Sequence, residues 1–371
     1  MKKFVALLLA LIMVFALCAC GNTTTTPEDK TPAAEETAAP AGNGDSAAAS
    51  SPTTTDEAKA AGRKILVMNQ HNSKESTNGQ FTQYFVDYVN NNSDTLWIDV
   101  YYNGELGGIQ ETLEGAIMGT IDIGGCSFAQ LATFYPEMEV WSMPYLYTDP
   151  YEGAKIVDLE KNTLLAEMID KCNEVSGMTI FALNYSIDAR QLTCNFPVYS
   201  PADLKGAKIR CITNPVYTMC IEGMGGTPIP IDWTETISAL TTGTVVGQEN
   251  PYATLASYQM WDCQKYVMET NHMFDFAANY ICTDTWNGLT DAEKQVLRDG
   301  IAAQQQFQNE TLETNKEEYK KLLLDNGMTI ITAEDGLDVD AFKSGVDALK
   351  EKNYPQYAEY FDYIADYLAN Y

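Results

Sequence analysis

The sequence predicts an α/β protein whose body folds as two domains. Strand and helix patterns alternate in two separate blocks, over residues 64–124 and 177–248, and such alternation is typical of α/β domains with a mainly parallel sheet. The body from Arg63 to Tyr371 has about 300 residues, which is enough for two hydrophobic cores. In sheets of this class, ligands bind beyond the carboxyl ends of the strands.

The first block contains three predicted strands and two predicted helices. The short apolar run at 64–69, the β-rich segment at 96–102 and residues 120–124 predict the strands. Residues 79–91 predict a helix because apolar side chains recur there at intervals of three and four residues. The same spacing predicts the second helix over 109–117.

The second block repeats this alternation. Its strands are predicted at 177–183, 208–212, 228–231 and 245–248, and its helices at 215–224 and 234–241, the latter started by an Asp/Thr cap. Arg210 and Asn250 therefore fall at strand ends. Side chains at such positions can reach a ligand beyond the sheet.

One predicted helix is unusually long. The pattern from Asp291 to Asn326 is helical throughout, and Thr290 with Glu293 forms a capping box at its start. A helix of about 35 residues is about 50 Å long, which is too long for one small domain. The aromatic-rich segment from Phe342 to Tyr371 is expected to pack as helices on the second domain.

The N-terminus predicts export and lipid anchoring. Residues 1–20 combine a positive start with a short apolar run, as a secretory signal peptide does. The run ends in Leu-Cys-Ala-Cys-Gly, which resembles a lipoprotein cleavage box with Cys20 as the lipidated residue; an ordinary signal peptide cut nearby is the alternative. Residues 21–62 lack aromatic side chains and predict a disordered tether. We therefore expect an extracytoplasmic protein held on the outer face of the cytoplasmic membrane.

The charge balance restricts the partners. The chain carries 51 acidic and 23 basic side chains, with a net charge of −28, which argues against nucleic acid and anionic lipid as ligands. Arginine is scarce, and beyond Arg63 only Arg190, Arg210 and Arg298 occur. A guanidinium matches a carboxylate through two parallel hydrogen bonds. Two arginines twenty residues apart in so acidic a chain therefore indicate a site for a small organic acid.

Sequence signatures of catalysis and metal binding are absent. There is no Gly-x-Ser-x-Gly, His-Glu-x-x-His or phosphate-binding loop motif. The seven cysteines after Cys20 are scattered without Cys-x-x-Cys spacing, so we expect buried small hydrophobic side chains, with one disulfide left open. We predict no catalytic residues, no metal and no cofactor.

Three motifs resemble one family when they are taken together. Arg190 precedes Pro197-Val198, then Pro-Ala-Asp-Leu-Lys-Gly-Ala-Lys-Ile-Arg spans 201–210, and Gly-Gln-Glu-Asn-Pro spans 247–251. Their order and spacing resemble the DctP-like substrate-binding proteins of tripartite ATP-independent periplasmic (TRAP) transporters. The resemblance extends from about residue 65 to 324. It departs at Val246, where the family usually has an aspartate.

The resemblance implies a two-domain fold like that of periplasmic binding proteins, with a central ligand cleft and a long helix that spans both domains. It implies a first domain at 63–187 and 276–315 and a second at 188–275 and 316–371. The protein would bind a small organic acid as a monomer, close its domains around the acid and deliver it to the TRAP permease. No reaction would be catalysed.

The resemblance also assigns the carboxylate-binding residues. Arg210 is expected to bind the ligand carboxylate, and Asn250 lies where the family has an amide that reaches the same group. Arg190 is expected to contact the ligand as well, although it could instead hold a domain edge.

Four further residues complete the predicted site. Trp233 could form an aromatic wall or belong to the core. His71 and Asn72 follow the first strand and could hydrogen-bond to ligand hydroxyls. Glu111 would repel an acid unless it binds hydroxyls. These polar candidates favour a hydroxylated sugar acid, such as a uronate or aldonate, over a C4-dicarboxylate.

Two other function classes remain open from the sequence. One is a ligand-sensing protein that presents its closed form to a signalling receptor. The other is a secreted carbohydrate-active enzyme, which would turn its ligand over, whereas a binding protein returns it unchanged.

Overall fold

The computed structural model describes residues 51–371. The predicted signal peptide at 1–20, the lipidated Cys20 and the tether up to residue 50 lie outside the described residues. The prediction of a disordered tether up to residue 62 is wrong for its last part, because Thr55–Ala60 forms helix α1. Thr54 caps this helix, Ala58 is fully buried, and the indole of Trp97 donates a hydrogen bond to Thr55 Oγ1 at 3.1 Å.

The first sheet has five strands in the order β2-β1-β3-β10-β4. These are β1 Lys64–Asn69, β2 Leu96–Tyr101, β3 Ile123–Ser127, β4 Met178–Tyr185 and β10 Phe276–Cys282. β1 pairs in parallel with β2 and β3, whereas β10 pairs antiparallel with β3 and β4. The sheet is mixed because β10 enters it from the second half of the chain.

The second sheet has six strands in the order β11-β9-β5-β8-β6-β7. These are β5 Arg190–Cys194, β6 Lys208–Cys211, β7 Thr227–Pro230, β8 Gly247–Pro251, β9 Tyr266–Met273 and β11 Thr329–Ile331. β5 is antiparallel to both β8 and β9, while the other pairs are parallel. Both sheets are thus mixed rather than mainly parallel as predicted.

Helices cover the sheets and connect their strands. The α-helices are α2 Thr77–Asn92, α3 Ile109–Met118, α4 Phe128–Leu131, α5 Glu152–Ile156, α6 Thr163–Ser176, α7 Pro215–Gly223, α8 Trp233–Thr241, α9 Tyr252–Ser257, α10 Thr283–Asn287, α11 Asp291–Asp325, α12 Val339–Asn353 and α13 Ala358–Asn370. Short 3₁₀ turns are η1 Pro136–Ser142, η2 Pro201–Leu204, η3 Met260–Asp262, η4 Ala333–Asp335 and η5 Pro355–Tyr357. In residues 51–371, no helix combines the length and apolar character needed to cross a membrane.

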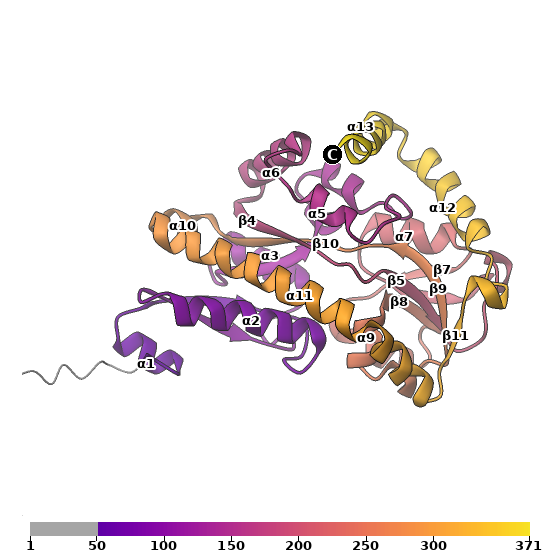
Figure 1. Ribbon diagram of the computed structural model, residues 1–371, viewed down its shortest axis with the longest axis horizontal. Coiled ribbons are helices and arrows are strands. Elements are labelled where there is room, and N and C mark those ends of the chain that lie inside the picture. Colours follow the sequence, from indigo (N-terminus) through magenta and orange to yellow (C-terminus); the bar gives the residue numbers. More distant parts are fainter. Residues whose placement is uncertain (1–50) are drawn as a thin grey trace, which may run out of the picture. The chain divides into compact units, whose positions relative to one another are not determined.

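The chain passes between the sheets at two neighbouring connections. β4 of the first sheet leads into β5 of the second, and β9 leads back into β10. The connections touch, since Ser186 N donates to the Asp275 carbonyl at 2.9 Å. Helix α11 also joins the two sheets, because it packs against α2 and β4 at one end and against α9 and β11 at the other (Figure 1). The predicted capping box of Thr290 and Glu293 starts it.

The C-terminal helices divide between the two sheets. α12 packs against α7 beside the second sheet, as predicted. α13 instead packs against α5, and the Tyr367 hydroxyl donates to the Lys155 carbonyl at 2.8 Å. The prediction that the whole segment packs on the second domain is therefore wrong for α13. Its tyrosines donate hydrogen bonds to residues within α5 and after it.

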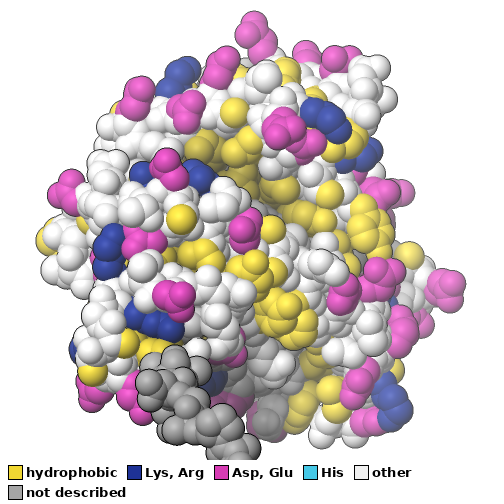
Figure 2. Space-filling model, turned by 60° about the vertical axis from the view of Figure 1, so that its left-hand side comes forward, with side chains coloured by type: hydrophobic (Ala, Val, Ile, Leu, Met, Phe, Trp, Pro, Cys, Tyr) yellow, Lys and Arg dark blue, Asp and Glu magenta, His cyan; other side chains and the backbone are white. Residues whose placement is uncertain are grey.

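The excess acidic charge lies on the surface and the cysteines lie inside. Asp and Glu side chains spread over the face that Figure 2 shows, interspersed with Lys and Arg. All seven cysteines within 51–371 are free thiols, and six of them are buried. This confirms the prediction that they pack as small hydrophobic side chains, and the part of the chain that the structure describes holds no disulfide.

Candidate functional site

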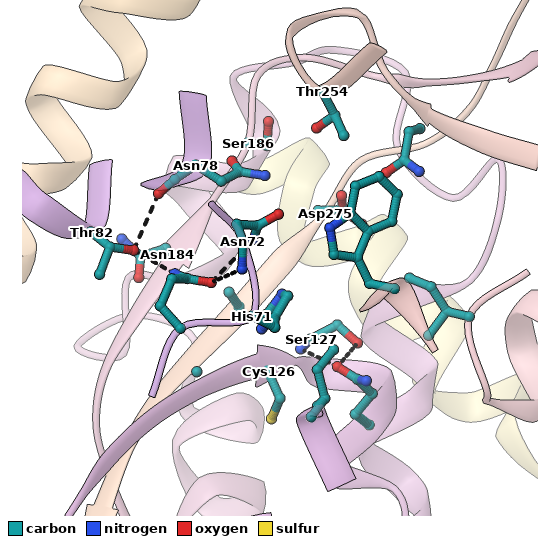
Figure 3. Close-up of a pocket in the computed structure, with 18 of the residues that line it drawn as sticks. His71, Asn72, Asn78, Thr82, Cys126, Ser127, Asn184, Ser186, Thr254 and Asp275 are labelled. Atoms are coloured by element: carbon teal, nitrogen blue, oxygen red, sulfur yellow. Dashed lines mark hydrogen bonds between the residues drawn. The ribbon is translucent and has the colours of Figure 1, made fainter. Parts of the chain in front are cut away.

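A cavity of about 800 Å³ lies between the two sheets, with walls from both. It borders the end of β1, the residues after β6 and β7, and the end of β8, so strand ends supply much of the lining. All seven predicted ligand-binding residues line it: His71, Asn72, Glu111, Arg190, Arg210, Trp233 and Asn250. Figure 3 shows part of this lining. The structure thus brings together residues from 71 to 250 around one space.

Arg210 presents an unpaired guanidinium to the cavity. Its side chain is only 2% exposed, and its Nε donates to the Ile231 carbonyl at 2.9 Å. Among residues 51–371 this is the one hydrogen bond that the guanidinium donates, and Arg210 lines the cavity. Burial lowers the pKa of Arg210 to about 10, so the group stays cationic at neutral pH. Such a group can bind a carboxylate through two hydrogen bonds.

Arg190 has a different environment. Its guanidinium binds both carboxylate oxygens of Glu249, and its Nη1 lies 2.7 Å from Asp275 Oδ2. Nη2 also donates to Asn250 Oδ1 at 3.0 Å. Arg190 therefore borders the cavity with most of its donors already engaged, which fits the alternative in which it holds a structural position.

Glu249, the buried partner of Arg190, is held in its ionised form. Burial alone raises the pKa of Glu249, but the charge of Arg190 and a hydrogen bond from His272 lower it to about 2. His272 Nε2 lies 3.2 Å from Glu249 Oε2. This cluster at the end of β5 and β8 fixes Asn250, whose Nδ2 donates to Gln248 Oε1 at 2.5 Å. Asn250 is thereby held at the cavity wall.

The residues after β1 form the opposite wall. Asn72 accepts a hydrogen bond from the Tyr258 hydroxyl at 3.1 Å, which links the first sheet's side to the second's. The pKa of His71 is lowered to about 4, mainly by burial, so its imidazole is neutral and can donate one hydrogen bond and accept another. Figure 3 shows both residues at the cavity.

Trp233 and Glu111 lie closer to the cavity entrance. Trp233 begins α8; its ring lies 5.7 Å from the Arg210 guanidinium carbon and edge-on to Tyr258, with 4.8 Å between centroids. The indole is half-buried and belongs both to the cavity wall and to a hydrophobic cluster behind it. Glu111 lies in the first turn of α3 and is exposed.

Four acidic residues at or beside the cavity were not among the predicted site residues. Glu249 lies inside the 247–251 motif, and Asp188, Asp232 and Asp275 line the cavity. Glu249 carried a usable signal, because it is the charged residue of a strand buried along its whole length, and buried charges need partners. The aspartates follow or precede strands in loops, where the sequence alone offers no comparable signal.

The cavity also contains neutral hydrogen-bonding side chains. Asn279 donates to Asn184 Oδ1, while Asn184 Nδ2 is buried without a partner in the described part of the chain. Ser186 and Thr254 lie at the same cavity, as Figure 3 shows. Within residues 51–371, no group of three or more His, Cys, Asp or Glu side chains could hold a metal ion.

The model of one protein family matches residues 68–356, and its description is bacterial extracellular solute-binding protein, family 7. The ectoine-binding periplasmic protein of Halomonas elongata is 26% identical over 274 residues, which cover 73% of this chain and 79% of that protein. The sialic acid-binding periplasmic protein of Vibrio cholerae is 24% identical over 232 residues, covering 62% and 71%.

Solved structures share the fold. A TRAP periplasmic solute-binding protein from Roseobacter denitrificans with bound L-galactonate matches with a TM-score of 0.74 at 22% identity, covering 81% of this chain and 98% of that one. One from Pseudomonas putida F1 with bound D-glucuronate matches with a TM-score of 0.73 at 24% identity, covering 81% and 97%.

Proposed function

Because this chain belongs to the bacterial extracellular solute-binding proteins of family 7, we propose that it captures a small organic acid and delivers it to the permease of a TRAP transporter. The ligand that we favour is a hydroxylated sugar acid, such as a uronate or aldonate. Sugar acids are bound in two structures of the same fold, as L-galactonate and D-glucuronate. The protein binds and releases this acid without chemical change.

The observation that carries this proposal is the state of Arg210. A buried cation that forms no ion pair is costly, so it is retained where a ligand supplies a carboxylate. Arg210 is such a cation: it lines the cavity, and the charges of Glu249 and Asp232 act on it without an ion pair among the described residues. Asn250 lies at the same wall and would add an amide donor to the ligand carboxylate.

The rest of the lining suits hydroxyl groups. Hydroxyls both donate and accept, and the amides and the neutral imidazole at the cavity can meet either role. Asn184 is the clearest case, since its buried Nδ2 has no acceptor among the described residues. His71 and Asn72 offer further partners from the same wall. Trp233 would pack against the carbon skeleton of the sugar.

Arg210→Lys tests the proposal. Lysine keeps the charge but loses the planar pair of donors, so affinity for an acid should fall by about 2–5 kcal/mol, at least about 30-fold in Kd. Calorimetry with a panel that includes D-glucuronate and L-galactonate measures this. Arg298→Lys is the matched control, since Arg298 lies outside the cavity. An Arg210→Lys protein within threefold of wild type for the best acid would refute carboxylate binding by this residue.

We also propose that domain I comprises residues 63–187 and 276–315 and domain II residues 188–275 and 316–371, with α13 packing against α5 of domain I, and that the two domains close around the ligand. Hydrogen bonds between the two proposed domains support this, such as the one that Asn214 Nδ2 donates to the Ala129 carbonyl at 2.6 Å. Small-angle scattering of the full-length protein should show a smaller radius of gyration on saturation. An unchanged radius would indicate a rigid binding module.

The protein is proposed to act outside the cytoplasm as a lipid-anchored monomer. The motif at Cys20 supports this, and a lipid there would hold the chain on the outer face of the cytoplasmic membrane. Cys20→Ala should release the protein from the membrane fraction, and retention with an unchanged mass would exclude Cys20 as the anchor.

A further inference from the structure

Two carboxylates of the cavity lining lie beside Gly108. Glu111 belongs to α3, next to the first sheet, and Asp232 caps α8, next to the second. A Cβ at Gly108 would lie 3.0 Å from Glu111 Oε2 and 3.1 Å from Asp232 Oδ2. Acids from the two halves of the fold are therefore near one another where Gly108 has no side chain.

Neither carboxylate is neutralised within the part of the chain that the structure describes. Asp232 Oδ1 accepts hydrogen bonds from the backbone and hydroxyl of Thr234, at 3.0 and 2.8 Å, but Oδ2 has no donor. Glu111 accepts no side-chain hydrogen bond and forms no ion pair among residues 51–371. A carboxylate oxygen accepts hydrogen bonds, so a ligand that displaces solvent from the exposed Glu111 and the partly buried Asp232 has to bring a donor to them.

The nearest cation is the one that we assign to the ligand carboxylate. Asp232 directly follows Ile231, whose carbonyl accepts from Arg210 Nε at 2.9 Å. Arg210 and Arg190 are the cationic side chains of the described cavity lining, and Arg190 is already paired with Glu249 and Asp275. The cavity therefore has one cation without an ion pair, buried to 98%. Several lining carboxylates also lack an ion pair among the described residues, and of these Glu111 and Asp232 both lie beside Gly108.

Resting on the proposed acid-binding function, we propose that Glu111 and Asp232 determine its specificity. They accept hydrogen bonds from a hydroxyl or ammonium group near the ligand's carboxylate, and they reject a second carboxylate. The ligand is thus a monocarboxylic acid with a donor substituent, rather than a dicarboxylate. A donor held between the two acids also offsets their mutual repulsion when the cavity is closed.

The proposed specificity has a physical basis, because a hydrogen-bond donor is attracted to the two carboxylates whereas a second anion is repelled by them. A hydroxyl or ammonium between the two acids gains charge-assisted hydrogen bonds. A second ligand carboxylate would instead add a third negative charge with no unpaired cation to meet it, and like charges brought together at a binding site cost several kcal/mol. The same pair therefore selects for one ligand class and against the other.

Two matched sets of acids test this on the full-length protein. The three-carbon set is glycerate, serine and tartronate, and the six-carbon set is D-gluconate, D-glucosaminate and D-glucarate. Each set holds a hydroxy acid, an amino acid and a diacid of equal carbon number. In calorimetry, we expect the better of the first two to bind at least about tenfold more tightly than the diacid. Comparing the hydroxy acid with the amino acid distinguishes a hydroxyl from an ammonium.

The double variant Glu111→Gln with Asp232→Asn supplies the decisive comparison. Asparagine remains a good helix N-cap, so the fold should persist, which circular dichroism checks. The preference over the diacid should shrink to less than threefold. Glu114→Gln, one turn further along α3 and outside the cavity, should keep the full preference.

The outcomes separate this inference from the proposed function. A wild-type protein that binds a diacid as tightly as its hydroxy acid would overturn the inference and leave acid binding intact. A double variant that keeps the full preference would do the same. Failure of all six acids to bind the wild type would count against both the inference and the proposed function.

Discussion

Arg190 and Arg210 lie twenty residues apart on strands of one sheet. They are almost equally buried, at 4% and 2% exposure, but they differ in their ionic partners. Arg190 binds two carboxylates, whereas Arg210 forms no ion pair among the described residues. The difference teaches that burial alone does not identify an arginine that binds a ligand. Whether acidic side chains of the protein already pair with its guanidinium is the more informative property.

The two environments have different consequences for stability. Arg190 offsets the charges of Glu249 and Asp275, and removing one member of such a buried cluster leaves the others uncompensated. Arg210 forms no ion pair among the described residues, although the charge of Glu249 favours its cationic form. Burial disfavours that charge more strongly, and a bound acid would supply the missing contact. Equal substitutions at the two positions should therefore give unequal results.

Arg190→Met should have the largest effect. It leaves Glu249 and Asp275 without their cation, and breaking a buried ion pair costs about 3–5 kcal/mol. Urea unfolding should show a correspondingly lower free energy of unfolding. Arg298→Met, at an exposed position, should cost less than about 1 kcal/mol. A loss of similar size in both variants would contradict a structural role for Arg190.

The pH dependence of stability sharpens the same point. The pKa of Glu249 is depressed to about 2 from an ordinary 4.5, so its ionised form stabilises the folded state fully above about pH 4.5. That contribution is lost as the pH falls from about 4.5 to 2, and it amounts to at most about 3 kcal/mol.

Glu249→Gln isolates this contribution. The difference in free energy of unfolding between wild type and Glu249→Gln should be largest above pH 4.5 and should narrow as the pH falls towards 2. Glu269→Gln, which breaks the partly exposed pair with Lys320, should cost about 1 kcal/mol or less at neutral pH. A gap that stays constant with pH would mean that Glu249 is not the ionised partner of Arg190.

Arg210→Met should have the smallest effect on stability. A buried charge without a partner is exchanged for an apolar side chain of similar length, so the free energy of unfolding should stay within about 1 kcal/mol of wild type or rise. Binding of acids should nevertheless be lost. If Arg210→Met destabilises as much as Arg190→Met does, the contrast between the two arginines is wrong.

Local patterns predicted the elements on which the site stands. The capping box of Thr290 and Glu293 located the start of α11, and the helical spacing over 79–91 located α2 to within two residues. The strand predicted at 120–124 lies three residues later, at Ile123–Ser127, because Gly119 adopts a left-handed conformation and the chain turns before the strand begins. Such turns depend on a few residues, so the first residue of a strand is difficult to predict from the sequence.

The strands β5, β9 and β10 were not predicted, and they carry the chain between the sheets. Their pairing is antiparallel and joins segments far apart in sequence, as between Phe276 and Tyr185. The spacing of apolar residues within one segment does not indicate which distant segment will pair with it. For this reason the sequence predicted two mainly parallel sheets where the structure has two mixed ones.

The sequence by itself determined which side chains could meet an acid. Arginine scarcity and the motifs at 201–210 and 247–251 indicated Arg210 and Asn250, and the structure places both at one cavity. Residue type and strand-end position depend only on nearby residues and marked both as candidates, while the resemblance of the motifs assigned them to a carboxylate.

Only the tertiary structure decided which charges pair. Arg190 meets Glu249 and Asp275, which are 59 and 85 residues away, and Glu111 and Asp232 both lie beside Gly108. These contacts arise from the register between strands and from the approach of two sheets. Because electrostatic energy depends on distance in space and on burial, the roles of the charged residues could be assigned only after folding had set both.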